Sequence, residues 1–363
     1  MDYCKVLEEL VMIEGLSGYE GKVAAAMKKM FSPFADSVIG DRAGNVIAEF
    51  RGTDPNAPIV MVAAHMDSLG FIIRRIEDNG FLQFDRLGGI PEKVLPALHV
   101  SVGTIDGGYV PGIIAVKAHH ITPPEEKMKV DGFRSLYIDI GAKSKEEVLA
   151  AGIHVGCPVV YTPSFTRLLG DRVTATTLDD RAGCTALAGI AEILHKNRPK
   201  ATTYLVASVW EEFNIRGAVI AARTVKPDIC IYLDCGQDGS TPEMHNSFNN
   251  VSMKGGPTVC MYNFHSRGTL NGCIGHMGLY KLALACAERR NLPVQETASL
   301  GWLTETAYLQ MEGKYVACID MGYPHRYAHS PTEVVAISDI KKLAELVSEM
   351  VVSIDQSFEV ARF

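Results

Sequence analysis

Hydrophobic side chains recur at helical spacing at both ends of the chain, which predicts amphipathic helices there. The first helix is expected over residues 2–14, and the capping-box spacing of Ser17 and Glu20 predicts that a second helix follows. The last helix is expected to begin after its N-cap, Ser338, and to bury one apolar stripe. That stripe consists of Ile340, Leu343, Val347, Met350 and Ile354.

Between these ends, runs of consecutive apolar residues alternate with helical patterns. Such runs suit strands that are covered on both faces, as in a parallel sheet. Strands and helices that alternate along a chain predict an α/β fold with a mostly parallel sheet. The expected strands are residues 59–64, 203–210, 229–233 and 315–321, and the expected helices between them are 182–194, 217–223 and 276–289.

From about residue 71 the pattern changes to short alternating segments that are separated by glycines, from Gly80 to Gly112. This pattern is typical of a small β-rich domain with tight turns. It has no catalytic strand end of its own, so we expect it to make contacts between the subunits of a homo-oligomer. The predicted domains are an inserted dimerisation domain over residues 71–171 and a catalytic α/β domain formed by residues 1–70 and 172–363.

Composition and charge narrow the functional classes. Of the 363 residues, 47% are hydrophobic and 21% are charged, which is typical of a folded globular protein. The net charge is −7 and no basic block occurs, so nucleic-acid binding is not expected. We find no start typical of a signal peptide and no apolar stretch of membrane-spanning length, so we expect a cytoplasmic protein that does not bind membranes. The nine cysteines are scattered without a C-x-x-C pair, as in a reducing compartment.

Potential metal ligands follow the predicted strands. His65 comes after the first strand, and Asp67 lies two residues on, so in an extended chain both side chains point the same way. Because sites in open α/β sheets form beyond the carboxyl ends of the strands, ligands from several strands are expected to meet. The other candidates are the pairs Asp179–Asp180 and Glu211–Glu212, then Asp234, and His325 or His329 in the loop after the last strand.

This mixture of imidazoles and carboxylates favours zinc, cobalt or manganese over a structural thiolate site. One bridging carboxylate with two more ligands for each metal would hold two ions about 3.5–4 Å apart. Glu211 and Glu212 are adjacent and point apart in an extended chain, so one can bind metal while the other faces the water between the ions. That other carboxylate would be the general base, which shuttles a proton to the leaving amine.

With these residues assembled, the chain resembles the tetrahedral aminopeptidase family of two-metal peptidases. The family includes glutamyl and deblocking aminopeptidases, and some members carry an endoglucanase label. The resemblance spans nearly the whole chain, with its motifs in the family order. The matching segments are residues 64–67 (AHMD), 87–89 (LGG), 138–142 (IDIGA), 178–183 (LDDRAG), 211–212 (EE) and 326–331 (RYAHSP).

The resemblance implies an enzyme that removes residues from the N-terminus of peptides with two divalent metal ions, zinc or cobalt first and manganese as a further option. It implies a phosphopeptidase-like α/β sandwich with an inserted PDZ-like β domain, and dimers that assemble into twelve-subunit shells. It also implies a role for each matching residue. The metal ligands are His65, Asp179, Glu212, Asp234 and His329, with Asp179 bridging; Glu211 is the catalytic base, and Asp67 orients His65.

One segment departs from the family pattern and bears on specificity. The family usually has Gly-Gly-Thr-Asp-Ala before the last strand, whereas residues 301–307 read Gly-Trp-Leu-Thr-Glu-Thr-Ala. Trp302 and Leu303 add bulk at glycine positions, and Glu305 is a methylene longer than aspartate. We therefore take Trp302 and Glu305 as candidate residues of the substrate pocket, with the alternative that Trp302 packs beneath the loop.

Several alternatives stay open. His325 competes with His329 as a ligand, although the family motif favours His329. His119 and His120 lie in the insertion and are either surface residues or part of an active site, which could be that of a neighbouring subunit. A carboxypeptidase or deacylase on the same fold would use the same metals. A glycosidase is a weaker alternative, because metal binding would occupy the carboxylates that it needs on either side of a sugar.

Overall fold

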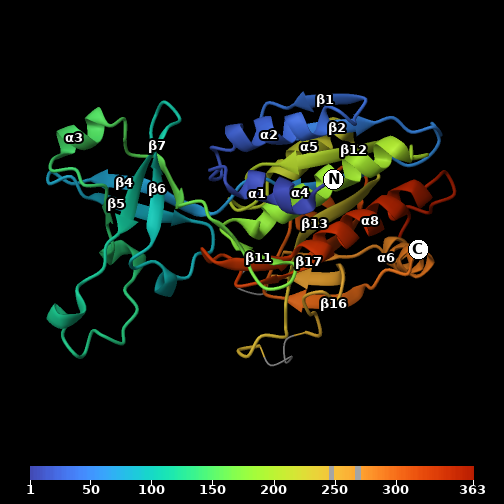
Figure 1. Ribbon diagram of the computed structural model, residues 1–363. Coiled ribbons are helices and arrows are strands. Elements are labelled where there is room, and N and C mark those ends of the chain that lie inside the picture. The colour runs from blue at the N-terminus through green and yellow to red at the C-terminus, as the bar shows by residue number, and fades with distance from the viewer. Residues whose placement is uncertain (245–248, 266–270) are drawn as a thin grey trace.

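The computed structural model describes residues 1–244, 249–265 and 271–363 of the chain. It consists of a large α/β part and a smaller β barrel that projects from one side of it (Figure 1). Within the described residues, twelve strands form the sheet of the large part and six strands close the barrel. Both termini lie on the large part, and the barrel comes from a single internal segment.

Four parallel strands occupy the centre of the large sheet, in the order β12, β3, β13, β17. Both faces of these strands are covered: β3 contributes Val62 and Ala64 to one hydrophobic core and Met61 and Ala63 to another. This arrangement confirms the α/β architecture that the apolar runs predict. The bounds are β3 (Val60–His65), β12 (Thr203–Ser208), β13 (Ile229–Gln237) and β17 (Ala317–Arg326).

Antiparallel strands complete both edges of the large sheet. β1 and β2 extend it beyond β12, and β18, β11 and β10 extend it beyond β17. A branch of three strands, β14 to β16, joins β17 through β14. The sequence pattern does not predict most of these short strands. They are β1 (Ser37–Gly40), β2 (Val46–Phe50), β10 (Phe165–Arg167), β11 (Arg172–Ala175), β14 (Thr258–Phe264), β15 (Gly272–Ile274), β16 (Gln295–Leu300) and β18 (Glu333–Ala336).

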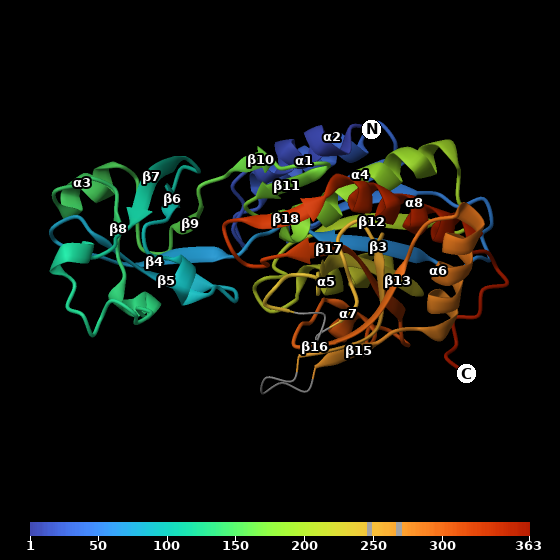
Figure 2. The ribbon, with the colours of Figure 1, turned by 60° about the horizontal axis from the view of Figure 1, so that its bottom comes forward.

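Helices cover both faces of the large sheet (Figure 2). The helices α1, α2, α4, α6 and α8 contribute to the larger core, whereas α5 and α7 contribute to the core on the opposite face. Among the described residues, no helix combines the length and the apolar character needed to cross a membrane. The bounds are α1 (Tyr3–Val11), α2 (Gly21–Phe31), α4 (Leu178–Lys196), α5 (Gly217–Val225), α6 (Met277–Arg290), α7 (Thr306–Leu309) and α8 (Ile337–Ser353).

Two predicted helix caps are wrong. α2 begins without a side-chain cap, and the hydroxyl of Ser17 instead donates a hydrogen bond to Asp67 Oδ2 at 2.6 Å. α8 already includes Ser338, and its N-cap, Ala336, offers no side-chain hydrogen bond. Ser17 therefore supports a residue 50 positions away in the sequence, which local spacing does not reveal.

The barrel has a hydrophobic core of its own. At its centre the ring of Phe71 meets Phe84 and Tyr161 edge to face, with centroids 5.0 and 5.9 Å away. Apart from the first residue of β4, the barrel strands lie within the insertion that was predicted over residues 71–171. The end of that range does not belong to the barrel, because β10 pairs with the large sheet. In barrel order the strands are β4 (Gly70–Ile76), β5 (Leu82–Leu87), β8 (Ile138–Asp139), β7 (Tyr109–Ile114), β6 (His99–Gly103) and β9 (Pro158–Tyr161); the helix α3 (Lys145–Ala150) and the 3-10 turns η1 (Glu92–Val94), η2 (His119–Ile121) and η3 (Phe133–Ser135) lie in their connections.

Candidate metal centre

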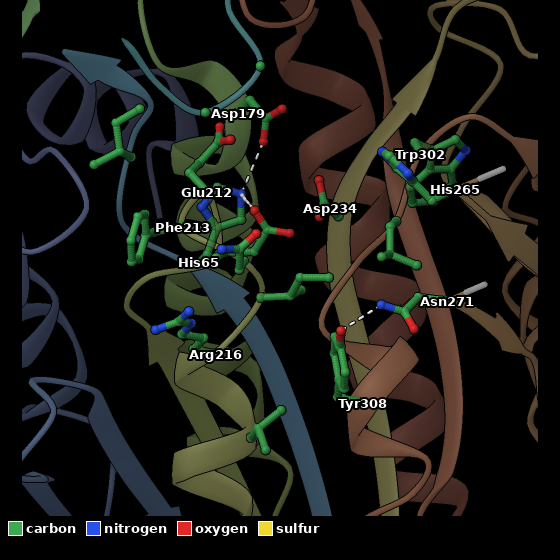
Figure 3. Close-up of a pocket in the computed structure, with 18 of the residues that line it drawn as sticks. His65, Asp179, Glu212, Phe213, Arg216, Asp234, His265, Asn271, Trp302 and Tyr308 are labelled. Atoms are coloured by element: carbon green, nitrogen blue, oxygen red, sulfur yellow. Dashed lines mark hydrogen bonds and ion pairs between the residues drawn. The ribbon is translucent and has the colours of Figure 1, made fainter. Parts of the chain in front are cut away.

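The candidate ligands gather at the carboxyl edge of the central strands, where sites in open α/β sheets are expected. They come from five different elements, and Figure 3 shows four of them facing one end of a cavity. The structure therefore brings together residues that lie up to 264 positions apart. His65 ends β3, Asp179 lies in the first turn of α4, Glu211 and Glu212 follow β12, Asp234 lies in the second half of β13, and His329 lies between β17 and β18.

Two groups of potential ligands share Asp179. Within each group, one ligand atom from every residue lies within 4.8 Å of the others. His65 Nε2 is 3.1 Å from Asp179 Oδ1, and His329 Nε2 is 3.6 Å from Asp179 Oδ2, so each carboxylate oxygen faces one imidazole. The first group consists of His65, Asp179 and Asp234, and the second of Asp179, Glu212 and His329.

Both imidazoles are oriented through their other ring nitrogen. His65 Nδ1 lies 3.2 Å from the backbone oxygen of Asp67, and His329 Nδ1 lies 2.7 Å from the backbone oxygen of Gly89. Such contacts make Nδ1 the donor and leave Nε2 free to bind a metal. A Cβ atom at Gly89 would lie 3.2 Å from His329 Nδ1, so a side chain at this position would crowd the ring.

Asp67 lies behind the site and holds the glutamate pair. Its Oδ1 accepts a hydrogen bond from the amide of Glu211 at 3.0 Å, and its Oδ2 accepts one from the amide of Glu212 at 3.1 Å. Burial opposes the ionisation of Asp67, but hydrogen bonding to His65 and these further donors lowers its pKa. A single buried carboxylate thus contacts His65 and both glutamates.

The buried carboxylates give the site an electrostatic requirement for cations. Burial raises the pKa of Glu211 and of Asp234 well above the usual range, and it raises that of Glu212 to about 7. Glu212 Oε1 is buried and has no hydrogen-bond partner among the described residues. A divalent cation would stabilise the ionised carboxylates and satisfy this oxygen. The residues present therefore fit a metal ion with nitrogen and oxygen ligands.

The cluster lines one end of a cavity of about 1170 Å³. Both parts of the molecule form its walls: residues 86–89 come from the barrel strand β5 and the loop after it, and Trp302 and Leu303 come from the large part. Figure 3 places Trp302 beside His265, with Tyr308 on the same side of the cavity. Trp302 thus lies where a substrate side chain could reach it, and its role in specificity stays a prediction.

Glu305 does not line the cavity, so the prediction that it contributes to the pocket is wrong. It is fully buried, and its carboxylate accepts hydrogen bonds from the hydroxyl of Ser208 (2.6 Å), the amide of Ala218 (2.6 Å) and the hydroxyl of Tyr232 (2.9 Å). These contacts tie the loop that carries Trp302 to β12, α5 and β13. Glu305 therefore supports the wall of the cavity from beneath.

The remaining candidate histidines lie outside the two ligand groups. His325 is buried, and its Nε2 lies 3.6 Å from Glu333 Oε2. His119 and His120 are exposed in η2 of the barrel and are not among the residues that line the cavity. Of the two histidines after β17, His329 is therefore the one that joins the cluster.

Three residues that support the ligands were not predicted from the sequence. Ser17 contacts Asp67, Gly89 contacts His329, and Glu333 accepts hydrogen bonds from two ligand backbones. Gly89 does lie in a segment that matches the family, but its contact is with a residue 240 positions away. Only Glu333 carries a local signal, because it lies four residues after His329 at the start of a strand.

A cluster of carboxylates and imidazoles at the carboxyl edge of such a sheet is typical of metal-dependent hydrolases. Residues 44–346 match the M42 glutamyl aminopeptidase family, and the chain belongs to this family. It is therefore a peptide hydrolase that uses a divalent metal ion, which confirms the resemblance found in the sequence.

Individual relatives and solved structures agree with this assignment. SgcX of Escherichia coli (strain K12) is 39% identical over 346 residues, which cover 95% of this chain and 92% of SgcX. The aminopeptidase APDkam598 from the archaeon Desulfurococcus kamchatkensis has a TM-score of 0.92 at 30% identity, covering 98% of this chain and 96% of that chain. The TET1 peptidase of Pyrococcus horikoshii has a TM-score of 0.85 at 26% identity, covering 97% and 100%, and is described as able to assemble into a tetrahedron or a large octahedral shell.

Proposed function

We propose that the protein is an aminopeptidase that removes the N-terminal residue of peptides with the help of two divalent metal ions. The observation that carries this proposal is the pair of ligand groups that share Asp179 at one end of the cavity. His65 and Asp234 would complete one metal site, and Glu212 and His329 would complete the other. A shared carboxylate with separate ligands on either side is the arrangement expected of a two-metal hydrolase.

Glu211 is the proposed general base. Its Oε2 lies 3.9 Å from His65 Nε2, yet Glu211 belongs to neither ligand group. Burial raises the pKa of Glu211 well above the usual range, whereas nearby cations would favour the ionised form that a general base needs. It would take a proton from the attacking water and deliver it to the leaving amine nitrogen. The bound metal ions would make that water more acidic and polarise the scissile carbonyl.

Asp67 would act on the reaction through the residues that it holds. Its backbone oxygen contacts His65, and its carboxylate accepts hydrogen bonds from the amides of Glu211 and Glu212. These contacts fix the segment in which the base and a ligand are neighbours. A rigid segment is needed here because the base and the ligand must keep separate orientations.

Zinc or cobalt is the proposed metal, and manganese is a further option. The proposed ligands are two imidazoles and three carboxylates, and no cysteine belongs to either ligand group. This mixture suits borderline divalent transition metals.

We also propose that the protein assembles through its barrel, first into dimers and then into a twelve-subunit shell, in the cytoplasm. The tetrahedral assembly described for the TET1 peptidase supports this proposal. Exposed apolar side chains on the barrel are a second reason, because such side chains often mark contact surfaces. They include Ile113, Val116, Ile121, Met128 and Val130. The family resemblance further implies a PDZ-like topology for the barrel.

The proposed reaction is tested with matched peptides that differ only in a free or an acetylated N-terminus. Metal-free protein is supplied with zinc, cobalt or manganese, and the released amino acids are identified by mass spectrometry. We expect sequential release from the free N-terminus only, and hydrolysis of aminoacyl-p-nitroanilides under the same conditions. Release from the C-terminus would identify a carboxypeptidase, and removal of the acetyl group would identify a deacylase; either result would contradict the proposal.

A further inference from the structure

Glu333 is the first residue of β18 and is almost completely buried, at 2% exposure, although the proposed chemistry makes no use of it. Its Oε2 accepts a hydrogen bond from the amide of Asp179 at 3.1 Å, and its Oε1 accepts one from the amide of His329 at 2.8 Å. One side chain therefore holds the backbone of the shared ligand and the backbone of a ligand that belongs to the second group alone.

The backbone at both ligands departs from regular structure. Asp179 has non-helical angles (φ −79°, ψ 107°) inside the first turn of α4. His329 has a left-handed φ of 64°, as has Tyr327 two residues earlier with 61°. Left-handed backbone is uncommon for residues other than glycine, so the surroundings must hold it in place. Glu333 helps to hold the backbone at Asp179 and His329, because its carboxylate accepts a hydrogen bond from each of these two amides.

His325 lies next to Glu333. It belongs to β17, and its Nε2 is 3.6 Å from Glu333 Oε2. Neither ring nitrogen of His325 has a hydrogen-bond partner among the described residues. An imidazole edge beside a buried carboxylate is a favourable neighbour, because buried carboxylates need donors or partners of opposite charge. His325 therefore has a place next to Glu333 and need not be a metal ligand.

His329 is thus fixed from two directions. The backbone oxygen of Gly89 contacts its ring at Nδ1, whereas Glu333 binds its backbone amide. Of these two contacts, only that with Glu333 also reaches Asp179. His329 Nε2 and Asp179 Oδ2 lie 3.6 Å apart, and movement of Glu333 would change this separation between two residues that would hold a metal ion.

We infer that Glu333 is a positioning residue that sets the geometry, and therefore the metal affinity, of the group formed by Asp179, Glu212 and His329. The inference rests on the proposed function in one respect, namely that a metal ion binds this group. Replacing Glu333 by glutamine keeps the size of the side chain but turns an NH₂ group toward one of the two amides. Loss of a residue that supports metal ligands typically weakens metal binding by about 10–100-fold. We expect this loss at the second group and a smaller one at the first, where Asp179 is the shared member.

The test is a calorimetric titration of the metal-free protein with zinc alone, in the presence of a competing chelator. Glu305→Gln is the matched control, because Glu305 is also a fully buried carboxylate with an amide donor and lies outside both ligand groups. We expect two zinc ions per chain in the wild type and in Glu305→Gln. Glu333→Gln should keep one site of high affinity and bind its second zinc ion more weakly. Glu333→Asp, whose shorter side chain can still accept one hydrogen bond, should lie between them.

Unchanged affinity for both zinc ions in a folded Glu333→Gln variant would overturn the inference. An equal loss in Glu305→Gln would overturn it as well, because it would indicate a general effect of altering buried carboxylates. Circular dichroism of the metal-free variants reports on folding. If Glu333→Gln does not fold, Glu333→Asp replaces it, and unchanged affinities there overturn the inference. A wild type that binds fewer than two zinc ions contradicts the two-metal function itself, which separates the two failures.

Discussion

The carboxyl edge of the large sheet and the barrel differ in which side chains they bury and which they expose. At the sheet edge, charged side chains are buried: His65, Asp67 and Asp179 are 1%, 0% and 6% exposed. On the barrel, apolar side chains are exposed, with Met128 at 94% and Val130 at 61%. Buried charges need partners of opposite charge, and exposed apolar surface favours contact with other apolar surface. The difference agrees with the proposed metal site at the sheet edge and with the proposed contact surface on the barrel.

Removing the metal should have the largest effect, and it should affect the sheet edge but not the barrel. A chelator should abolish hydrolysis, because the buried carboxylates of the site cannot activate water without cations. It should leave the assembly intact, because no barrel residue belongs to the ligand groups. Hydrolysis of aminoacyl-p-nitroanilides and light scattering measure the two effects on the same sample, and added zinc, cobalt or manganese should restore activity. Full activity in a verified metal-free sample is the result that would contradict this prediction.

The adjacent glutamates at the sheet edge are expected to have different roles. Glu211→Gln should keep both metal ions and lower kcat on the order of 10²–10⁴-fold, because it removes the general base. Glu212→Gln should lose metal, because its carboxylate belongs to the second ligand group. Metal content by mass spectrometry and steady-state kinetics distinguish the two variants. Each variant is the control for the other, and exchanged phenotypes would reverse the roles assigned to the pair.

Trp302 lies in the cavity between the two regions, and a smaller effect is expected there. Trp302→Gly should open space beside the site and change the ratio of kcat/KM between large and small N-terminal residues by about tenfold or more, since pockets discriminate by size on this scale. The metal content should stay the same. A panel of aminoacyl-p-nitroanilides measures the ranking. If every substrate loses the same factor, or none does, Trp302 has a structural role only.

The smallest effect on catalysis is expected from changes to the barrel surface. The double variant Met128→Ser and Val130→Ser should weaken self-association, because burial of each large apolar side chain contributes about 1.5–3 kcal/mol. The kcat should remain close to that of the wild type. Leu169→Ser is the control, because Leu169 is 92% exposed but lies between β10 and β11 of the large sheet. If light scattering finds the same assembly for the wild type, the double variant and Leu169→Ser, this part of the barrel surface does not form the proposed contacts.

The sequence predicts the central strands well, because burial on both faces leaves a run of consecutive apolar residues such as that of β3. The strands β14 to β16 leave no such run. β14 pairs with β17 over its first half and with β15 over its second half, whereas β16 pairs with both halves, with an irregularity between Cys260 and Asn263. Their pairing depends on neighbours that are distant in sequence, so a local pattern does not predict it.

The residues of the site also fall into those that the sequence predicts and those that it does not. Residues that follow central strands, such as His65 and Asp234, could be found because parallel strands carry their ends to one edge of the sheet. The contact of Glu305 with Tyr232 and that of Glu333 with Asp179 could not be predicted, because these partners lie 73 and 154 residues away in the chain. A carboxylate near a site is thus recognisable from its type and spacing, whereas its contacts depend on the complete fold.

Anomalous diffraction from crystals of the zinc-loaded protein tests the central claim most directly. We expect two zinc peaks in each chain, on either side of the Asp179 carboxylate. One peak should also contact His65 and Asp234, the other should contact Glu212 and His329, and Glu211 should bind neither ion directly. A single peak, or two peaks that do not share Asp179, would contradict the proposed two-metal site.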